Sequence, residues 1–157
     1  MSILIDENTT FIIQGITGRE AVTMTREVLD YGSKVLGGVT PRSQGPQRPR
    51  LPVEDTVRAF DGASADASVK LCPAFATDAV FEAVEAGIKL VIIVTERIPR
   101  SRRPVRRVRD QHGARIIGPN CLGAIPPGKA RGRRAAPPNR RAAFKPGVVG
   151  VMSRSGG

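Results

Sequence analysis

The sequence has few of the residues that usually carry out catalysis or bind metals. Its 157 residues include one histidine, two cysteines, one tyrosine, five phenylalanines and no tryptophan. Two cysteines, Cys72 and Cys121, are too few for a disulfide framework or a metal cluster, so we expect free thiols in a reducing compartment. His112 is the sole histidine, and it does not accompany either cysteine in a recognisable motif. We therefore assign neither a catalytic nucleophile nor a general base.

Long apolar stretches are also missing. No run of 18 apolar residues occurs, so we expect no membrane-spanning helix. The first ten residues, MSILIDENTT, lack the basic region followed by an apolar stretch that is typical of a secretory signal. We expect a cytoplasmic protein. The length predicts one domain, or one domain and part of another.

The positive charge of the chain is concentrated in its second part. Residues 1–96 hold 9 Lys and Arg against 13 Asp and Glu, a net charge of −4, whereas residues 97–157 hold 16 against 1, a net charge of +15. Most of this excess lies in residues 97–115 and 128–147. Such segments attract polyanions, namely nucleic acid, anionic lipid or a phosphate-rich cofactor.

Apolar patterning predicts alternating strands and helices. We expect strands at 10–14, 34–39, 67–72, 88–95, 114–118 and 148–153. We expect helices at 19–31 and 54–60, and a third that Thr77 or Asp78 caps and Gly87 ends. The basic segment RRPVRRVRDQHG predicts a further helix after Pro104. Alternation of this kind is typical of an α/β fold with a doubly wound, mainly parallel sheet and helices on both faces.

The stretch TFIIQGITGREAVTM, residues 10–24, combines a buried strand, a glycine corner and a helix. Gly15 and Gly18 allow the backbone to approach a phosphate, and the N–H groups that open the helix face it. Ala21 lets the helix pack close to the sheet. The spacing differs from the G-x-G-x-x-G pattern of dinucleotide-binding proteins. The corner thus predicts a phosphate or diphosphate site, and a purely structural turn is the alternative.

Other expected strands end in similar polar segments: VTP at 39–41, CPA at 72–74, VTER at 94–97 and GPNCLG at 118–123. Carboxyl ends of parallel strands meet at one edge of a sheet, which is where ligands bind in doubly wound folds. Four such endings favour a ligand groove at this edge over four unrelated turns.

Together these segments resemble the N-terminal CoA-binding domain of the α subunit of succinate–CoA ligase. The resemblance rests on MSILIDENTT, QGITGREA, YGSKVLGGVTP, EAGIKLVIIVTERIP, RIIGPNCLG and KPGVVGVMSRSGG, in the family's order and approximate spacing. It implies a Rossmann-like domain that binds coenzyme A. With the corner and strand ends, the expected CoA-binding residues are Gly15, Thr17, Gly18, Arg19, Glu20, Val39, Thr40, Pro41, Arg42, Ser43, Pro73, Val94, Thr95, Glu96, Asn120 and Cys121.

The sequence departs from this family at two kinds of position. The family's loop after VTP has a glycine followed by a basic residue, and it uses a lysine near Ser43, whereas this chain has Arg42 and Ser43. The basic segments also replace more neutral ones. We divide the chain into a CoA-binding domain at 1–125, a basic Pro- and Arg-rich connector at 126–146, and the start of a second, flavodoxin-like ligase domain at 147–157.

The resemblance implies an acid–CoA ligase that forms a thioester at the expense of a nucleoside triphosphate, together with a β subunit. The histidine that becomes phosphorylated in the family belongs to the second domain, so we expect this sequence to contribute CoA binding alone. Two alternatives stay open. One is a stand-alone nucleotide-binding Rossmann module, although no acidic residue ends the strand at 34–39 to hold a ribose. The other is nonspecific nucleic-acid binding through 97–145.

Overall fold

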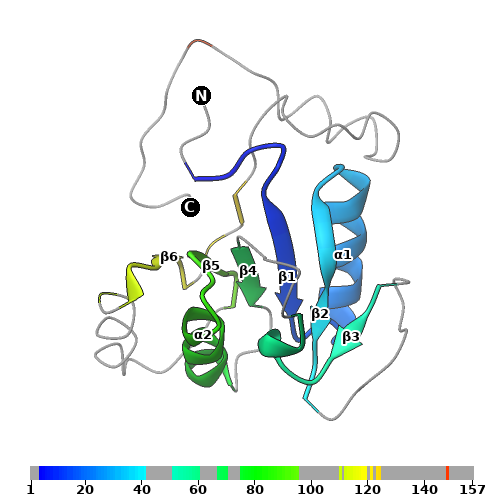
Figure 1. Cartoon of the computed structure of the whole chain (residues 1–157). Coiled ribbons are helices and arrows are strands. Elements are labelled where there is room, and N and C mark those ends of the chain that lie inside the picture. The colour runs from blue at the N-terminus through cyan, green and yellow to red at the C-terminus, as the bar shows by residue number, and fades with distance from the viewer. Residues whose placement is uncertain are drawn as a thin grey trace.

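The structure is a computed structural model, shown in Figure 1. It describes residues 4–41, 51–60, 67–70, 75–95, 110, 112–119, 121, 123–124 and 148. Within these residues no helix is both long and apolar enough to cross a membrane.

A single parallel sheet forms the centre of the fold. Its strands are β1 (Thr10–Gln14), β2 (Lys34–Val39), β3 (Val53–Glu54), β4 (Ala67–Lys70), β5 (Leu90–Ile93) and β6 (Arg115–Ile117). They lie in the order β3-β2-β1-β4-β5-β6, and every described pair is parallel. This is the strand order of a Rossmann fold, in which the direction of winding reverses between β1 and β4. The fold class predicted from the sequence is confirmed.

Helix α1 (Arg19–Asp30) joins β1 to β2. Its expected inner face is present, with Ala21 buried and Met24, Val28 and Tyr31 half-buried. The apolar pattern did not predict that Thr25 is buried, since threonine is polar. Its hydroxyl donates to the carbonyl of Ala21, one turn earlier, at 2.6 Å, so the buried polar group has a partner.

The segment predicted as a helix at 54–60 divides into two elements. Val53 and Glu54 form β3 beside Gly38 and Val39 of β2, and a 3-10 helix, η1, covers Val57–Phe60. A two-residue strand is too short to show periodicity, so the helix prediction was wrong at its beginning. The buried side chain of Val53 favours pairing with the sheet over exposure in a helix.

Helix α2 covers Ala76–Glu85, and its N-cap residue lies two or three residues before the predicted one. Phe75 is the N-cap residue, and no side chain caps this helix, so the assignment of Thr77 or Asp78 as the cap was wrong. Both lie inside the first turn, where buried Ala76 and Ala79 already follow the helical periodicity. Gly87, with φ of 92°, follows the helix end as predicted.

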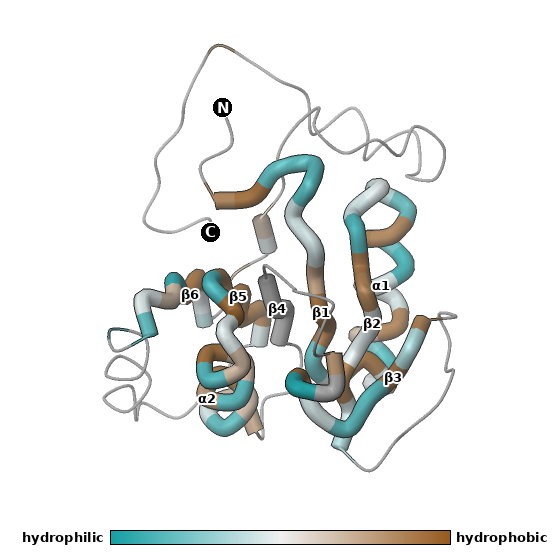
Figure 2. The backbone as a smooth tube through the Cα atoms, in the orientation of Figure 1, coloured by the Kyte–Doolittle hydropathy of each residue, from teal (hydrophilic) through white to brown (hydrophobic). Residues whose placement is uncertain are grey.

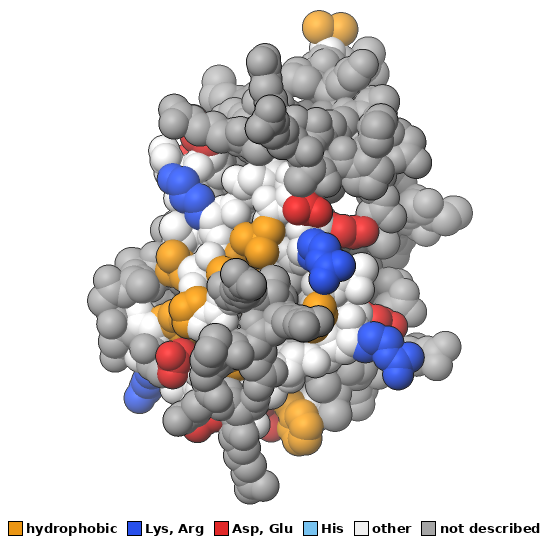
Figure 3. All heavy atoms as spheres, turned by 90° about the vertical axis from the view of Figure 1, so that its right-hand side faces the viewer, with side chains coloured by type: hydrophobic (Ala, Val, Ile, Leu, Met, Phe, Trp, Pro, Cys, Tyr) orange, Lys and Arg blue, Asp and Glu red, His pale blue; other side chains and the backbone are white. Residues whose placement is uncertain are grey.

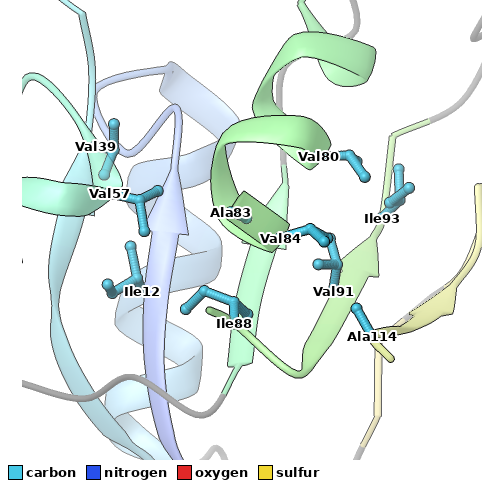
Figure 4. Packing of buried hydrophobic residues seen from close by; sticks show 10 residues of the cluster. All are labelled: Ile12, Val39, Val57, Val80, Ala83, Val84, Ile88, Val91, Ile93 and Ala114. Atoms are coloured by element: carbon cyan, nitrogen blue, oxygen red, sulfur yellow. The ribbon is translucent and has the colours of Figure 1, made fainter. Parts of the chain in front are cut away.

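The two helices cover opposite faces of the sheet, as Figures 1 and 4 show. Ile12 of β1 packs on the α2 face with Val80, Ala83 and Val84, whereas its neighbour Phe11 packs on the other face near Met24 of α1. All four residues of β5 are buried, as expected for a strand covered on both sides. Figure 2 shows hydrophobic colour along β5 and alternating colours along both helices.

Two of the predicted elements lie mostly outside the described residues. Of the helix expected after Pro104 the structure describes Asp110, His112 and Gly113, and of the strand at 148–153 only Val148.

Candidate functional site

The glycine corner is a tight turn at the carboxyl end of β1. Gly15 has φ of 85°, in the left-handed region that favours glycine. Its N–H donates to the carbonyl of Val39 at 2.6 Å, and its own carbonyl accepts the N–H of Gly18 at 3.1 Å. The backbone therefore reverses direction within four residues and enters α1 at the edge of the sheet.

Ile16 fixes the corner onto the sheet. Its side chain is 1% exposed and packs with Ile13 and Val53. A Cβ added to Gly38 would collide with the Ile16 side chain, so only a glycine at 38 leaves room for it. An apolar residue between polar turn residues was the signal that sequence reasoning overlooked.

The N-terminus of α1 opens toward solvent. Gly18 is the N-cap residue with extended backbone, and no side chain caps the helix. The first backbone bond into the helix runs from the N–H of Val22 to the carbonyl of Gly18 at 2.9 Å. The N–H groups of Arg19, Glu20 and Ala21 precede it and have no intrahelical partner. Because residues 18–20 are exposed, this end of the helix is accessible to an anion.

The corner is bonded to the end of β2. The hydroxyl groups of Thr17 and Thr40 lie 3.2 Å apart and share a hydrogen bond. The N–H of Thr40 in turn donates to the carbonyl of Glu54 at 2.9 Å, and Pro41 next to it is exposed. The structure thus brings together the predicted site residues Gly15, Thr17, Thr40 and Pro41. Val39 contributes its carbonyl to the corner, while its side chain is buried in the core.

The ends of β5 and β6 form a second group at the same edge. Val94 and Cys121 belong to one apolar cluster, and Thr95 is 6% exposed. A Cβ on Gly118 would collide with the carbonyl of Ile93, so the residue after β6 lies directly against the end of β5. The Cys121 sulfur accepts the N–H of Gly123 at 3.2 Å.

A buried amide links the corner to α2. Gln14, the last residue of β1, is 2% exposed. Its Nε2 donates to the carbonyl of Ala79 at 2.9 Å and lies 3.5 Å from Oε2 of Glu82. The other oxygen of Glu82 accepts the N–H of Val57 at 2.8 Å. One polar network therefore connects β1, α2 and η1 immediately beside the corner, and no sequence pattern indicated it.

A groove of about 370 Å³ lies between η1 and α2, and its lining residues are Thr56, Arg58, Asp78, Phe81, Glu82 and Glu85. None of these is a predicted site residue. Three carboxylates against one guanidinium make this groove unsuited to a phosphorylated ligand. The uncapped end of α1 is better suited to an anion.

Five predicted site residues lie outside the described residues: Arg42, Ser43, Pro73, Glu96 and Asn120. On the side of the molecule where α1 and β3 lie, Figure 3 shows basic and acidic side chains interspersed among the described residues. Among the described residues, no group of three or more His, Cys, Asp or Glu side chains is arranged to hold a metal ion.

Comparison with known proteins gives a consistent result. The family model "CoA binding domain" matches residues 6–97. Succinate–CoA ligase [ADP-forming] subunit alpha 1 of Archaeoglobus fulgidus is 45% identical over 163 residues, which cover 99% of this chain and 53% of that protein. The malate–CoA ligase α subunit of Methylorubrum extorquens is 42% identical, with coverage of 99% and 54%. The chain thus spans about half the length of the curated relatives that it matches.

Among solved structures, PH0766 from Pyrococcus horikoshii superposes with a TM-score of 0.65 at 19% identity, covering 75% of this chain and 29% of that one. This likeness bears on the fold alone. The family match covers more than half of the sequence and includes the corner, α1 and the ends of β1, β2 and β5. The chain therefore belongs to the CoA binding domain family, and its sequence resembles those of succinate–CoA ligase α subunits.

Proposed function

We propose that the chain binds coenzyme A at the carboxyl edge of the sheet, with the CoA diphosphate at the glycine corner. The observation that carries this proposal is the uncapped, exposed N-terminus of α1, tied to the end of β2 by the pair Thr17–Thr40. Free N–H groups and the positive end of the helix dipole together favour a phosphate. The remaining predicted residues, including Arg42, Ser43, Pro73, Glu96 and Asn120, complete the proposed site.

Within a complete enzyme, this domain supplies CoA to an acid–CoA ligase that consumes a nucleoside triphosphate. We base this on the relatives, which are α subunits of succinate–CoA and malate–CoA ligases, and we propose a β subunit as partner. We assign no residue of this chain to the acyl phosphate and phosphohistidine steps, since the sole histidine, His112, lies in no matching motif. The proposed location is the cytoplasm. The division at 125 and 146 into domain, connector and second-domain start also remains our proposal.

Isothermal titration of the whole chain with CoA and with desulfo-CoA tests the proposal. Both ligands are expected to bind with similar affinity, because the phosphates and not the thiol contact the corner. Arg19→Glu places a negative charge at the exposed start of α1 and is expected to weaken CoA binding about tenfold. Arg26→Glu is the matched control: it makes the same change of charge at an exposed position two turns along the same helix.

Two results would contradict the proposal. One is the absence of heat with millimolar CoA, and the other is tighter binding of NADH than of CoA, which would favour the nucleotide-binding alternative. An equal effect of the two arginine variants would show that overall charge, and not the corner, governs affinity.

A further inference from the structure

Phe75 is an aromatic residue that lies largely in solvent, with 65% of its surface exposed. The other aromatic residues that the structure describes are buried or half-buried: Phe11, Tyr31, Phe60 and Phe81. Single exposed apolar side chains are common on protein surfaces, so exposure alone indicates nothing. The position of Phe75 in the fold is what makes it informative.

Phe75 lies at the same edge of the sheet as the glycine corner, after β4, the neighbour of β1. It is the N-cap residue of α2, which follows β4 in a parallel sheet, so it belongs to the carboxyl edge. Its carbonyl accepts the N–H of Ala79 at 3.0 Å, and the carbonyl of Ala79 accepts Nε2 of Gln14 at 2.9 Å. Gln14 directly precedes Gly15. Two hydrogen bonds therefore connect Phe75 to the strand end that makes the corner.

The two sides of the corner differ in polarity. On the β2 side, Thr40 and the exposed Pro41 are followed in sequence by Arg42. On the other side, Val94 and Cys121 are half-buried members of an apolar cluster. CoA has a matching asymmetry. Its adenosine 3′,5′-bisphosphate half is anionic, whereas its pantetheine arm is uncharged and carries two methyl groups on one carbon of the pantoate unit.

We propose that Phe75 packs against the dimethyl group of the pantetheine arm of bound CoA. The inference rests on the proposed function and adds an orientation to it, with the nucleotide half toward β2 and the arm toward β4, β5 and β6. An aromatic side chain offers a large apolar area at a small cost in conformational entropy, which suits a contact with a flexible arm.

Titration of the whole chain and of Phe75→Ala with three ligands tests this inference. The ligands are CoA, 4′-phosphopantetheine and adenosine 3′,5′-bisphosphate. Phe75→Ala is expected to weaken binding of CoA and of 4′-phosphopantetheine by about tenfold, through loss of buried apolar area, and to leave the bisphosphate unchanged. Phe75→Leu keeps an apolar side chain and is expected to recover most of the lost affinity.

Leu4→Ala is the matched control. Leu4 is 39% exposed and precedes β1, so it lies toward the amino ends of the strands, away from the carboxyl ends where Phe75 lies. Its removal is expected to change none of the three affinities. A thermal melt of each variant establishes that the fold is retained.

The outcomes separate this inference from the proposed function. If the whole chain binds CoA and Phe75→Ala binds all three ligands equally well, the contact is refuted and CoA binding stands. A loss confined to the bisphosphate would refute the proposed orientation. If the unaltered chain does not bind CoA, the proposed function fails and the inference fails with it.

Discussion

At the scale of single residues, the close contact of Ile16 with Gly38 helps to hold the glycine corner against β2. Gly38→Ala places a methyl group where the Ile16 side chain lies, so we expect a loss of about 1–3 kcal/mol in the free energy of unfolding. Urea denaturation measures this loss. Ile16→Ala removes Cγ2 and Cδ1, two of the three atoms nearest to the new methyl group, and combined with Gly38→Ala it is expected to cost less than the sum of the two single changes. Strict additivity would contradict the contact.

The Gln14 network gives a second prediction. Gln14→Leu removes the side-chain donor to the carbonyl of Ala79 and to Oε2 of Glu82, so we expect a loss of about 1–3 kcal/mol in the free energy of unfolding. Thr25→Val is a matched control, because Thr25 is also buried and also donates to a carbonyl inside a helix, that of Ala21, but no carboxylate depends on it. We expect a smaller loss for the control in the same urea titration, and equal losses would count against a role for the network.

These residues also show where sequence reasoning stops. Gly15 and Gly18 were found because a glycine corner between an apolar strand and a helix is a local pattern. Gln14 and Ile16 lie in the same stretch, yet their roles depend on Ala79 and Gly38, which are far away in the sequence. Pairing of residues so distant in the chain leaves no periodicity to detect.

At the scale of elements, α1 lacks a capping side chain at its N-terminus, which costs stability and leaves the first N–H groups of the helix accessible. Gly18→Asp would place a carboxylate at the N-cap, where it accepts a free N–H group, and the nearest atom to a new Cβ is 3.4 Å away. We expect a gain of up to about 1 kcal/mol in the free energy of unfolding and a loss of CoA affinity, because the carboxylate competes with the phosphate.

Urea denaturation and calorimetry on the same protein measure these two quantities. Gly18→Ala is the control, since alanine adds a Cβ without an acceptor. If Gly18→Asp bound CoA as tightly as the unaltered chain, the start of α1 would not be the phosphate site.

Most elements were predictable because their signals are local. The bounds of β1 and β2 agree with the prediction, and α1 differs by one residue. The failures share a cause. The strand β3 has two residues, and the start of α2 lacks a capping side chain, so neither leaves a pattern in the sequence and both are set by neighbouring elements.

At the scale of the whole molecule, the positive charge lies in a different part of the sequence from most of the strands. Residues 1–96 carry a net charge of −4 and include all described strands but β6, whereas residues 97–157 carry +15. We expect the chain to bind duplex DNA without sequence preference, and to lose roughly a hundredfold in affinity between about 50 and about 200 mM salt.

Fluorescence anisotropy with two unrelated duplexes measures this binding. Replacing the seven arginines of 97–109 by glutamine is expected to abolish most of it. A difference between the duplexes, or affinity that resists salt, would indicate specific recognition.

The absence of a side chain at Gly38 determines how closely the turn after β1 can pack on β2. Two hydrogen bonds, Gly15 to Val39 and Thr17 to Thr40, tie the turn to the end of β2, and between them the side chain of Ile16 packs directly on the backbone of Gly38. A smaller aliphatic residue at position 16 is expected to let the turn pack closer to β2, and a larger one is expected to push it away. If CoA binds at the corner as proposed, we expect a graded series at position 16 to change its affinity, although the Ile16 side chain itself is buried.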